Sequence, residues 1–507
     1  MSARLPEQVD VVIAGAGPAG TSLAASLLNK GVPSSRILVV ERSTAPKPRN
    51  QSRALAIHAR TLELLAAEID DQDSPLTHTH ARTDAQGNIQ YGDAVGVSVD
   101  EPIERPCRSA THEIVRRGFL AMSMSMWERD MSKGKIMGVD MSGLPSRFRH
   151  VTSLGQIYTE EIIAARFETL GGQIHKGWSV EDVTVSRDEA EAQRPVTVTL
   201  TNEDGVEAKV KCCLIVGADG SHSVVREKAG IAFEGGRWNE TFLNADVVVR
   251  DPAWPFSQAS GERNGRRGGM NVVSEDGALM VIPLAGGGLR LAAVTGLEEI
   301  DRSIEDARRR STKQTTSDVL VDDNQKQDRG GHLVETIDLG ADKVQTVLDL
   351  LGPSVEADAE TKEKPSDITK IVWTSAYHVA HRIASEMFKA EARTVVIGDA
   401  CHTHSPMGGQ GLNAGVTDAL QLSQILAPAI LNNNLASVKD YPRIEDDLSV
   451  WSVQRRKKVQ AIAGRADAMH RAARMRGKWF NWIRISLFRL VGNFLGRKMA
   501  KVVAGFD

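Results

Sequence analysis

The chain has 507 residues, of which 41% are hydrophobic and 25% are charged, the usual balance of a globular protein with a core of its own. Its four cysteines form no CxxC pair, which argues against a disulfide scaffold and a structural zinc site and favours a reducing compartment. The net charge of −3 is uneven: residues 451–507 hold fourteen Lys or Arg against two Asp or Glu, so the remainder carries −15 and would repel nucleic acid.

The N-terminal region predicts a βαβ unit. Residues 1–10 lack the apolar segment of a secretory signal, and no uninterrupted run of about 18 apolar residues occurs, so we expect a cytoplasmic protein without a membrane-spanning helix. The β-branched segment 8–14 predicts a buried strand, 20–29 a helix and 36–40 a second strand. A strand, a helix and a strand within about thirty residues indicate a parallel sheet.

The middle of the chain predicts a second, antiparallel sheet. After a helix at 160–170, strands are expected at 196–200 and 209–216, and a hairpin at 278–283 and 289–294. Because no helices alternate with these strands, we expect a sheet separate from the parallel one.

The last third of the chain returns to α/β patterning and then becomes helical. The charged segment 298–343 predicts a surface insertion with no core of its own. A buried strand is expected at 394–397 and a helix at about 415–431, and everything after Trp451 is expected to be helical.

The first motif is GAGPAG at residues 15–20, between a predicted strand and a predicted helix. Gly15 permits the tight turn, Gly17 lets the backbone approach a pyrophosphate, and Gly20 lets helix and strand pack closely. The helix N-terminus supplies N–H groups to the phosphates. Glu41 ends the next strand, where a carboxylate can accept hydrogen bonds from ribose hydroxyls. The sequence therefore predicts a dinucleotide site.

Two further motifs follow predicted strands. GADGS at 217–221 alone would be an ordinary strand-end turn. VVIGDA at 395–400 leads into CHTHSPMGGQGLNAG at 401–415, where glycines open a helix whose N–H groups can stabilise negative charge on a flavin ring. His402 and His404 lack a third ligand, so we expect hydrogen-bonded loop histidines and no metal.

Together, these three motifs resemble the class A flavoprotein monooxygenases of the p-hydroxybenzoate hydroxylase type. They are most similar to the branch that hydroxylates phenolic polyketides and substituted phenols, as are the segments 52–65 and 155–162. The resemblance extends from Val9 to about Leu431. It implies an α/β fold: a Rossmann-like FAD-binding domain, a β-sheet substrate domain and a short helical C-terminal tail.

The resemblance also implies a domain division. The FAD-binding domain would comprise 1–80, 105–232 and 380–450, the substrate-binding sheet domain 81–104 and 233–379 with the charged insertion 298–343, and the basic helical segment 451–507.

A set of FAD-binding residues follows from the same resemblance. Glu41 would hold the adenosine ribose, Asp399 the ribityl chain, and Asp219 with Gly220 both FAD and a passing NADPH. The backbone of Leu412 would face the pyrimidine side of the flavin. The full expected set is Gly15, Gly17, Ala19, Gly20, Glu41, Arg42, Arg53, Gln156, Val183, Asp219, Gly220, Asp399, Gly411, Leu412 and Asn413.

The reaction centre should contain Pro406 over the flavin, close to the C4a-hydroperoxide that the family forms. A catalytic base for the substrate phenol is open; His58, His112 and His150 are candidates by residue type, although each is better explained as a packed or surface histidine. Flexible methionines between Met122 and Met141 could line a wide substrate pocket or fill the core.

The C-terminal segment mixes aromatic and cationic residues. Many relatives continue into a thioredoxin-like domain, whereas here we expect a helical tail. Residues 475–501 could form an amphipathic helix with an apolar stripe from Trp479 to Leu490 and with Arg484 and Arg489 in water. We expect this helix to pack on its own protein; a peripheral membrane contact and a homodimer remain open alternatives.

The sequence thus predicts an FAD-dependent monooxygenase that uses NADPH and O2 to hydroxylate a phenolic or polyketide-like aromatic, with NADH as an alternative reductant. Rival predictions are Baeyer–Villiger insertion or oxidative dearomatisation, a flavin-dependent isoprenoid reductase, and a non-catalytic flavin-binding protein. All of them depend on the three motifs meeting around one ligand.

Overall fold

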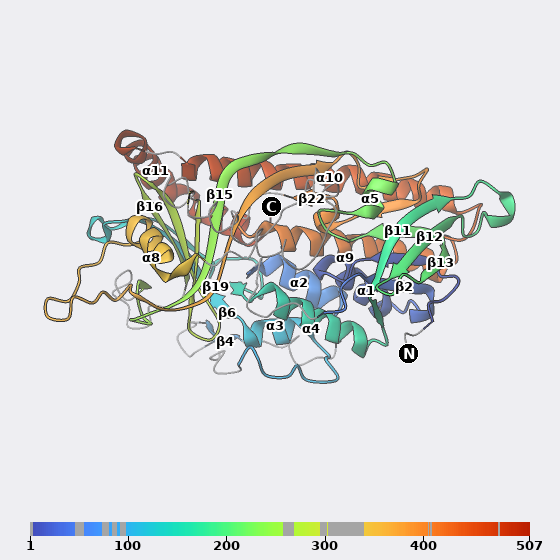
Figure 1. Ribbon diagram of the computed structural model, residues 1–507, viewed down its shortest axis with the longest axis horizontal. Coiled ribbons are helices and arrows are strands. Elements are labelled where there is room, and N and C mark those ends of the chain that lie inside the picture. The colour runs from blue at the N-terminus through green and yellow to red at the C-terminus, as the bar shows by residue number, and fades with distance from the viewer. Residues whose placement is uncertain are drawn as a thin grey trace.

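The computed structural model describes residues 4–45, 55–72, 81–83, 89–91, 98–256, 268–294, 302, 339–403, 405, 408–474 and 477–506. Two sheet regions lie at opposite ends of the molecule, with helices between them and the two C-terminal helices along one side (Figure 1).

The first sheet is the parallel one that the N-terminal pattern predicts. Its strands are joined in the order β10-β2-β1-β14-β21-β20, and all neighbours are parallel except the last pair. Their bounds are β1 Val11–Ala14, β2 Ile37–Glu41, β10 Ile174–Lys176, β14 Leu214–Gly217, β20 Phe388–Lys389 and β21 Thr394–Val396. Strands β1 and β14 are buried on both faces, which explains their continuous apolar sequences.

Apolar helices pack against this sheet. Helix α1 (Pro18–Asn29) buries every residue from Gly20 to Leu28 and packs on α9 (Gln410–Leu431). Helix α9 is the one helix of the described chain with the length and hydropathy to cross a membrane, but 67% of its most apolar window is buried inside the protein. It is therefore a core helix. The other helices here are α2 (Ala59–Glu68), α3 (Ala110–Arg117), α4 (Gln156–Thr169) and α5 (Val224–Lys228).

Helix α9 begins five residues before the predicted start at Gly415. The glycines at 411 and 415 made this segment look like a loop, because glycine weakens isolated helices. In the folded protein Gly415 lies against Gly398, where an added Cβ would come within 3.1 Å of the Gly398 Cα. Tertiary packing thus stabilises a helix that local propensity disfavours.

A three-stranded antiparallel sheet joins β11 (Trp178–Val185), β12 (Val196–Asn202) and β13 (Glu207–Cys212). The single strand predicted at 209–216 is wrong, because the chain changes partners at Cys213. Up to Cys212 it pairs with β12, the Cys213 N–H then donates to the Asp10 carbonyl at 2.9 Å, and Leu214 starts β14 beside β1.

The largest sheet has eight strands in the order β22-β19-β15-β18-β17-β16-β7-β8. It confirms the predicted hairpin, now β17 (Gly277–Pro283) and β18 (Leu289–Val294), and it is antiparallel except where β16 meets β7. The other strands are β7 Ser123–Glu128, β8 Lys135–Asp140, β15 Phe233–Val249, β16 Gly268–Ser274, β19 Ile368–Ala384 and β22 His402–Thr403. Strands β7 and β8 come from the segment that the predicted boundaries assigned to the FAD-binding part.

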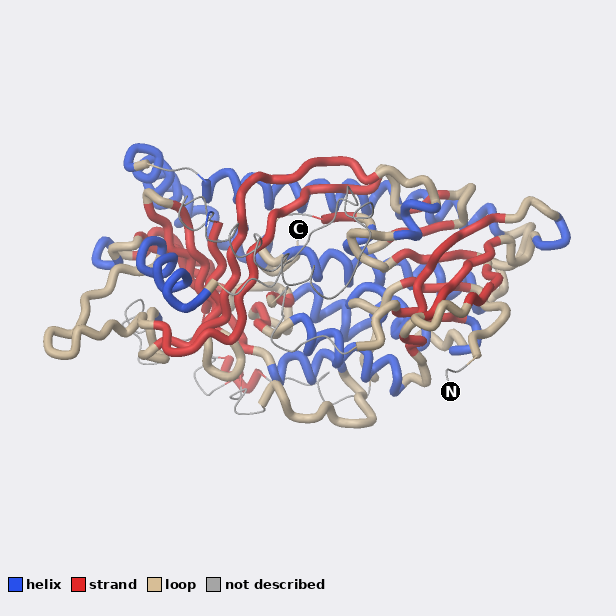
Figure 2. Tube along the Cα trace, in the orientation of Figure 1, coloured by secondary structure: helices blue, strands red, loops and turns tan. Residues whose placement is uncertain are grey.

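The two faces of the eight-stranded sheet differ. Helix α8 (Gly340–Leu351) packs on one face through Val344, Val347 and Leu351, against residues such as Val272. The other face points toward the helices of the parallel sheet. Strands β15 and β19 are long and run from this sheet back along the molecule (Figure 2). Most of the predicted insertion 298–343 lies outside the described residues.

Short strands and two long helices complete the chain. A three-stranded sheet joins β3 (Ala56–Ile57), β9 (Val151–Ser153) and β6 (Phe119–Ala121), and β4 (Ala81–Thr83) pairs with β5 (Ile89–Tyr91). After α9 come α10 (Tyr441–Arg474) and α11 (Lys478–Val503).

The predicted amphipathic pattern of the tail is only partly right. Helix α11 does pack on its own protein, through Ile485 and Phe488 against Ile136 and Val273. The residues of the expected apolar stripe do not share one environment, however: Ile485 is buried, whereas Trp479 and Leu490 face solvent. Arg484, expected in water, is 4% exposed because it donates to the Ser274 carbonyl at 2.8 Å.

The packing of α1 predicts a large cost for a core truncation. Leu23 is fully buried in the main core, so Leu23→Ala should lower the free energy of unfolding by about 2–5 kcal/mol. Val453→Ala, at a site that is 56% exposed, should change it by less than about 0.5 kcal/mol. Urea titrations of both variants measure the difference, and equal values would contradict this description of the core.

Candidate functional site

The three sequence motifs meet at one edge of the parallel sheet. They follow β1, β14 and β21, which are neighbours in the sheet and parallel, so their carboxyl ends lie side by side. A cavity of about 810 Å³ opens there, and Gly17, Asp219 and Asp399 all line it. This position is where open parallel sheets bind ligands.

The glycines of the first motif have distinct structural reasons. Gly15 has φ +100, and an added Cβ would lie 2.3 Å from the Ala218 carbonyl oxygen. At Gly20 a Cβ would lie 2.0 Å from the Gly15 carbonyl oxygen. A Cβ at Gly17 would meet nothing within 4 Å, so the backbone of this residue borders open space. The backbone of the loop is therefore tightly packed at Gly15 and Gly20, and it borders open space at Gly17, where a phosphate would approach.

Glu41 lies at the end of β2 and lines the same cavity. Its carboxylate accepts hydrogen bonds from the backbone N–H of Ala16, at 2.9 Å, and of Ser43, at 3.0 Å. These bonds fix the carboxylate beside the glycine loop. Each carboxylate oxygen has a second lone pair with which to accept from a ligand hydroxyl.

Asp219 offers an acceptor that the protein leaves unsatisfied. One carboxylate oxygen accepts from the Val225 N–H at 3.2 Å, and the other is buried without a hydrogen-bond partner. Burial raises the pKa of Asp219. A buried acceptor without a partner is costly, so this atom is suited to a ligand that donates to it.

Arg226 connects the second motif to the third. Its guanidinium donates to the Ala400 carbonyl at 2.9 Å and to the Ser221 carbonyl at 3.1 Å, and it lies over the Phe233 ring. The 3₁₀ turn Gly398–Ala400, which carries Asp399, is therefore held against the strand-end turn of β14. The Asp399 side chain is exposed toward the cavity.

The glycine-rich loop ends at the N-terminus of α9, which points its first backbone N–H groups toward the cavity lined by Gly411 and Leu412. Gly409, with φ +63, precedes the helix. The Asn413 side chain faces away from the cavity and holds the loop: it donates to the carbonyls of Ala56 (2.8 Å) and Gly409 (2.7 Å) and accepts from the His58 N–H (2.9 Å).

A buried ion network beneath this loop was missed by the sequence analysis. Asp418 of α9 accepts from the Gly398 N–H (3.1 Å) and from His402 Nε2 (2.7 Å), and it pairs with Arg455 of α10. Burial alone would raise the pKa of Asp418, but the charges of Arg455 and His402 lower it to about 2. The only signal in the sequence was a carboxylate within an apolar helix.

The expectation that His402 is hydrogen-bonded is confirmed by this network, but the residue lies in the two-residue strand β22 and not in a loop; His404 lies outside the described residues. In the part of the chain that the structure describes, no three His, Cys, Asp or Glu side chains gather as metal ligands would.

Most of the expected cofactor residues come together. Those that line the cavity are Gly15, Gly17, Ala19, Glu41, Arg42, Gln156, Asp219, Gly220, Asp399, Gly411 and Leu412. Gly20, Asn413 and Val183 do not line it; for β11 the lining residues are Trp178, Ser179 and Val180. Arg53 and Pro406 lie outside the described residues.

The same cavity extends over the inner face of the eight-stranded sheet. Its wall there is mostly apolar and includes Met124, Met126 and Met137 from the methionine-rich segment, which lies on β7 and β8. Polar groups are few: Asn244 and Asn271 line this part, as does Arg290, which is fixed by two hydrogen bonds to Asp246 at 2.6 and 2.7 Å. Such a lining suits an aromatic ligand with a few polar substituents.

Among the three candidate bases, only His58 lines the cavity. Its Nε2 lies 3.2 Å from the Gly408 carbonyl, and burial lowers its pKa to about 4, so it is neutral at pH 7. His150 is buried beside Thr152, away from the cavity, and burial lowers its pKa to about 4 as well. His112 does not line the cavity; its backbone N–H donates to the hydroxyl of the N-cap residue Ser109 at 3.0 Å in the first turn of α3.

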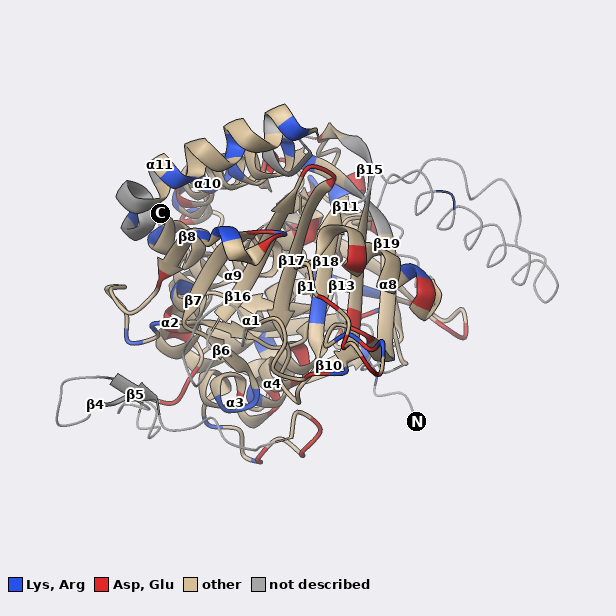
Figure 3. Cartoon of the chain, turned by 90° about the vertical axis from the view of Figure 1, so that its left-hand side faces the viewer, with Lys and Arg blue, Asp and Glu red and all other residues tan. Residues whose placement is uncertain are grey.

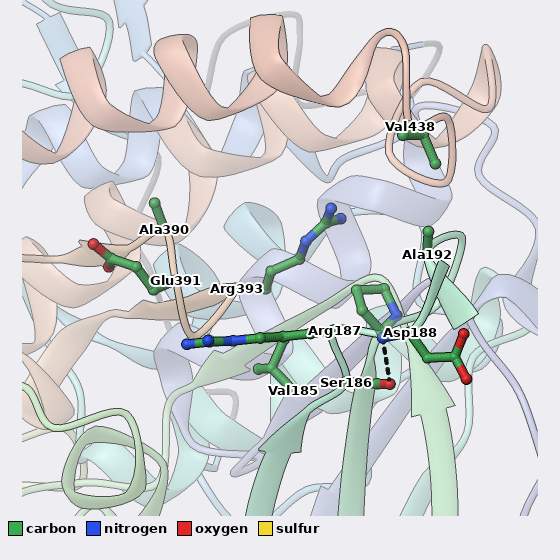
Figure 4. Close-up of a pocket in the computed structure, with 10 residues that line it drawn as sticks. Val185, Ser186, Arg187, Asp188, Ala192, Ala390, Glu391, Arg393 and Val438 are labelled. Carbon is green, nitrogen blue, oxygen red and sulfur yellow. Dashed lines mark hydrogen bonds between the residues drawn. The ribbon is translucent and has the colours of Figure 1, made fainter. Parts of the chain in front are cut away.

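A second, smaller pocket of about 210 Å³ lies elsewhere (Figure 4). It is bordered by the segment Val185–Asp188 after β11 and by residues around Arg393. None of the three motifs contributes to it, so it is not a continuation of the site.

The chain matches one protein family, described as an FAD binding domain, over residues 8–328 and 354–440. It is 27% identical over 434 residues to 6-methylpretetramide 4-monooxygenase from Streptomyces rimosus, which covers 84% of this chain and 57% of that protein. It is also 27% identical over 455 residues to 3-hydroxybenzoate 4-monooxygenase from Comamonas testosteroni, covering 85% of this chain and 56% of that protein. The chain therefore spans little more than half the length of these relatives.

The fold is similar to that of p-nitrophenol 4-monooxygenase from Pseudomonas putida, with a TM-score of 0.66 at 19% identity, covering 99% of this chain and 98% of that one. It also resembles the anhydrotetracycline hydroxylase of Streptomyces rimosus, with a TM-score of 0.61 at 22% identity, covering 99% of this chain and 76% of that one.

The buried histidines predict an acid-sensitive fold. Because the folded-state pKa of His58 and of His150 lies near 4, below the unfolded value of 6.5, unfolding takes up protons between these values. Their stabilisation is complete above pH 6.5 and is lost as the pH falls toward 4, by up to roughly 3 kcal/mol per histidine.

Urea unfolding at several pH values between 7.5 and 4.5 measures this slope. His58→Gln and His150→Gln should each reduce the loss of stability on acidification, whatever their effect at pH 7.5. An unchanged slope in both variants would show that other groups control the acid response.

Proposed function

Because this chain belongs to the FAD-binding domain family, we propose that it is an FAD-dependent monooxygenase that hydroxylates a phenolic or polyketide-like aromatic with NADPH and O2. The observation that carries the proposal is one continuous cavity, lined at one end by the three motifs and at the other by the inner face of the eight-stranded sheet.

The residues at the motif end fit FAD. Gly17 leaves room for the pyrophosphate, and the carboxylates of Glu41 and Asp399 stand where ribose and ribityl hydroxyls can donate. The unsatisfied oxygen of Asp219 is a further acceptor. The N-terminus of α9 offers N–H groups to the electron-rich end of the flavin ring. Bound FAD would supply hydride acceptance and oxygen activation.

The residues at the sheet end would bind and orient the substrate. The apolar wall of β7, β8 and β17 removes water from the reacting ring, which matters because oxygen activation without transfer wastes reductant as hydrogen peroxide. Asn244 and Asn271 would fix the orientation through substrate oxygens. Neutral His58 borders the cavity near Gly408, where its Nε2–H donates to the Gly408 carbonyl and helps to fix the loop before α9.

Family resemblance supports NADPH over NADH as the reductant, a contribution of Pro406 and Arg53 to the site, and the division into cofactor and substrate domains. The relatives are named as monooxygenases of 3-hydroxybenzoate and of a pretetramide, which favours hydroxylation over the reductase alternative.

The glycine geometry predicts a variant that loses cofactor and keeps its fold. Gly17→Ala puts a methyl group where the pyrophosphate would lie, while meeting no protein atom within 4 Å. We expect FAD affinity to fall by at least about tenfold, with unchanged thermal unfolding of the cofactor-free protein. Flavin fluorescence titration and calorimetry measure the two effects.

Gly236→Ala is the matched control, because this exposed glycine of β15 also has no atom within 4 Å and does not line the cavity. It should leave both quantities unchanged. If Gly17→Ala bound FAD normally, the pyrophosphate position assigned here would be wrong.

The proposed reaction predicts substrate-stimulated NADPH consumption. The purified protein should be yellow, and NADPH oxidation should accelerate with phenols that fit the cavity. With ¹⁸O2 the product should gain one labelled oxygen, and peroxide should remain low. Reaction without oxygen would favour the reductase alternative, and a product with an oxygen inserted into a carbon–carbon bond would favour Baeyer–Villiger chemistry.

A further inference from the structure

Helix α11 has one face buried against the protein. Ile485 is 6% exposed and packs with Ile136 of β8, and an added Cβ at Gly492 would come within 2.7 Å of the Met137 Cβ. The buried Arg484 donates to the Ser274 carbonyl, and Arg489 pairs with Glu128 at 2.9 Å. These contacts fix how the helix is rotated about its axis.

The opposite face of α11 is apolar and exposed. The exposed side chains are Trp479 at 69%, Trp482 at 62%, Ile483 at 42%, Leu487 at 55% and Leu490 at 78%. Each lies three or four residues from another member of the set, so they form one stripe of about three turns. The two indole rings pack against each other with centroids 5.7 Å apart. We call these five residues the α11 outer stripe.

Exposed cations lie before and after the outer stripe along the chain. Lys478 directly precedes Trp479, Lys498 and Lys501 follow Leu490 in the last turns of α11, and Arg465 and Arg471 are exposed on the preceding helix α10. Figure 3 shows Lys and Arg side by side along these two helices. The segment 451–507 carries a net charge of +12, whereas the rest of the chain carries −15. An anionic partner would therefore meet the protein at this side.

We propose that the α11 outer stripe docks on the surface of an anionic phospholipid bilayer, with α11 parallel to the membrane plane. Tryptophan prefers the boundary between headgroups and acyl chains, and the lysines beside it would contact lipid phosphates and carboxylates. Exposed aromatic residues and exposed cations on the same helix are features that such interfacial helices share.

A bilayer fits this surface better than a second copy of the chain. A two-fold pairing of the outer stripe with itself would bring two basic segments together, which costs electrostatic energy. A different surface of the copy would need its own apolar patch. The other exposed large apolar residues of the described chain are Val206, Leu350, Val372, Leu431, Val438, Val450, Val453 and Met469, which are spread over several elements and include no aromatic side chain.

Docking would also bring the substrate end of the cavity close to the bilayer. Phe488, Met499 and Val503, on other faces of the same helix, line the cavity. One helix thus separates the lipid surface from the space in which we place the aromatic substrate. The docking itself does not depend on the proposed oxygenase activity.

Vesicle co-sedimentation of the full-length protein tests the proposal. We expect binding to vesicles of phosphatidylcholine mixed with phosphatidylserine, little binding to phosphatidylcholine alone, and weaker binding at high salt. The tryptophan emission should shift to the blue when the vesicles bind. Failure to bind the anionic vesicles at low salt would overturn the proposal.

Two variants locate the contact. Trp479→Ser/Trp482→Ser should weaken binding by at least about tenfold with unchanged thermal unfolding, because both side chains are exposed. Val450→Ala/Val453→Ala, which removes exposed apolar groups from α10, is the matched control and should bind normally. Normal binding by the tryptophan variant would refute the assignment, as would light scattering that shows a dimer dissociated by that variant.

Discussion

The site depends on a steric constraint: three strand ends approach one another more closely than side chains would allow. The backbone at Gly15 lies against the Ala218 carbonyl, and Gly20 lies against the Gly15 carbonyl. At the third strand, Gly398 lies close to Ala19 and Gly415. These contacts bring the loops after β1, β14 and β21 to one cavity, and they require residues without a Cβ, or with a methyl group, at each point of contact.

Hydrogen bonds and ion pairs then hold these loops in position. Arg226 joins the turns after β14 and β21, while Asp418 connects the loop before α9 to Arg455 of α10. On the other side, long β15 and β19 connect the parallel-sheet region to the eight-stranded sheet (Figure 2). The cavity is therefore bounded by elements that hold one another in place, as a site that must exclude water requires.

Local sequence patterns correctly predicted those parts of the fold that depend on residues close together along the chain. The β1–α1–β2 unit and the β17–β18 hairpin lie where they were predicted, because apolar runs bounded by glycines determine them locally. Features that depend on contacts between residues far apart in the sequence were not predicted. The break at Cys213 follows from pairing with β1, and the early start of α9 follows from contact with Gly398. The burial of Arg484 depends on the carbonyl of Ser274, which lies 210 residues away.

The same division holds for the site. Roles could be assigned to Gly15, Gly17 and Glu41 because a strand, a glycine motif, a helix and a carboxylate at the end of the next strand form a recognisable local pattern. The Asp418 network could not be predicted, since its three side chains come from helices α9 and α10 and from the short strand β22. Val183 was expected at the site from the family resemblance, whereas Trp178, Ser179 and Val180, earlier in β11, line the cavity.

The size of the cavity makes the stability of the protein depend on the ligand that fills it. A space of about 810 Å³ between the two sheet regions is a large gap in the interior, and the atoms that face it gain van der Waals contacts on that side when a ligand fills it. Occupancy then adds to the free energy of unfolding by mass action: free flavin at 100 times its dissociation constant adds about 2.7 kcal/mol. The stability of newly made chains would thus rise with the logarithm of the free flavin concentration, and flavin scarcity would leave cofactor-free chains more exposed to proteases.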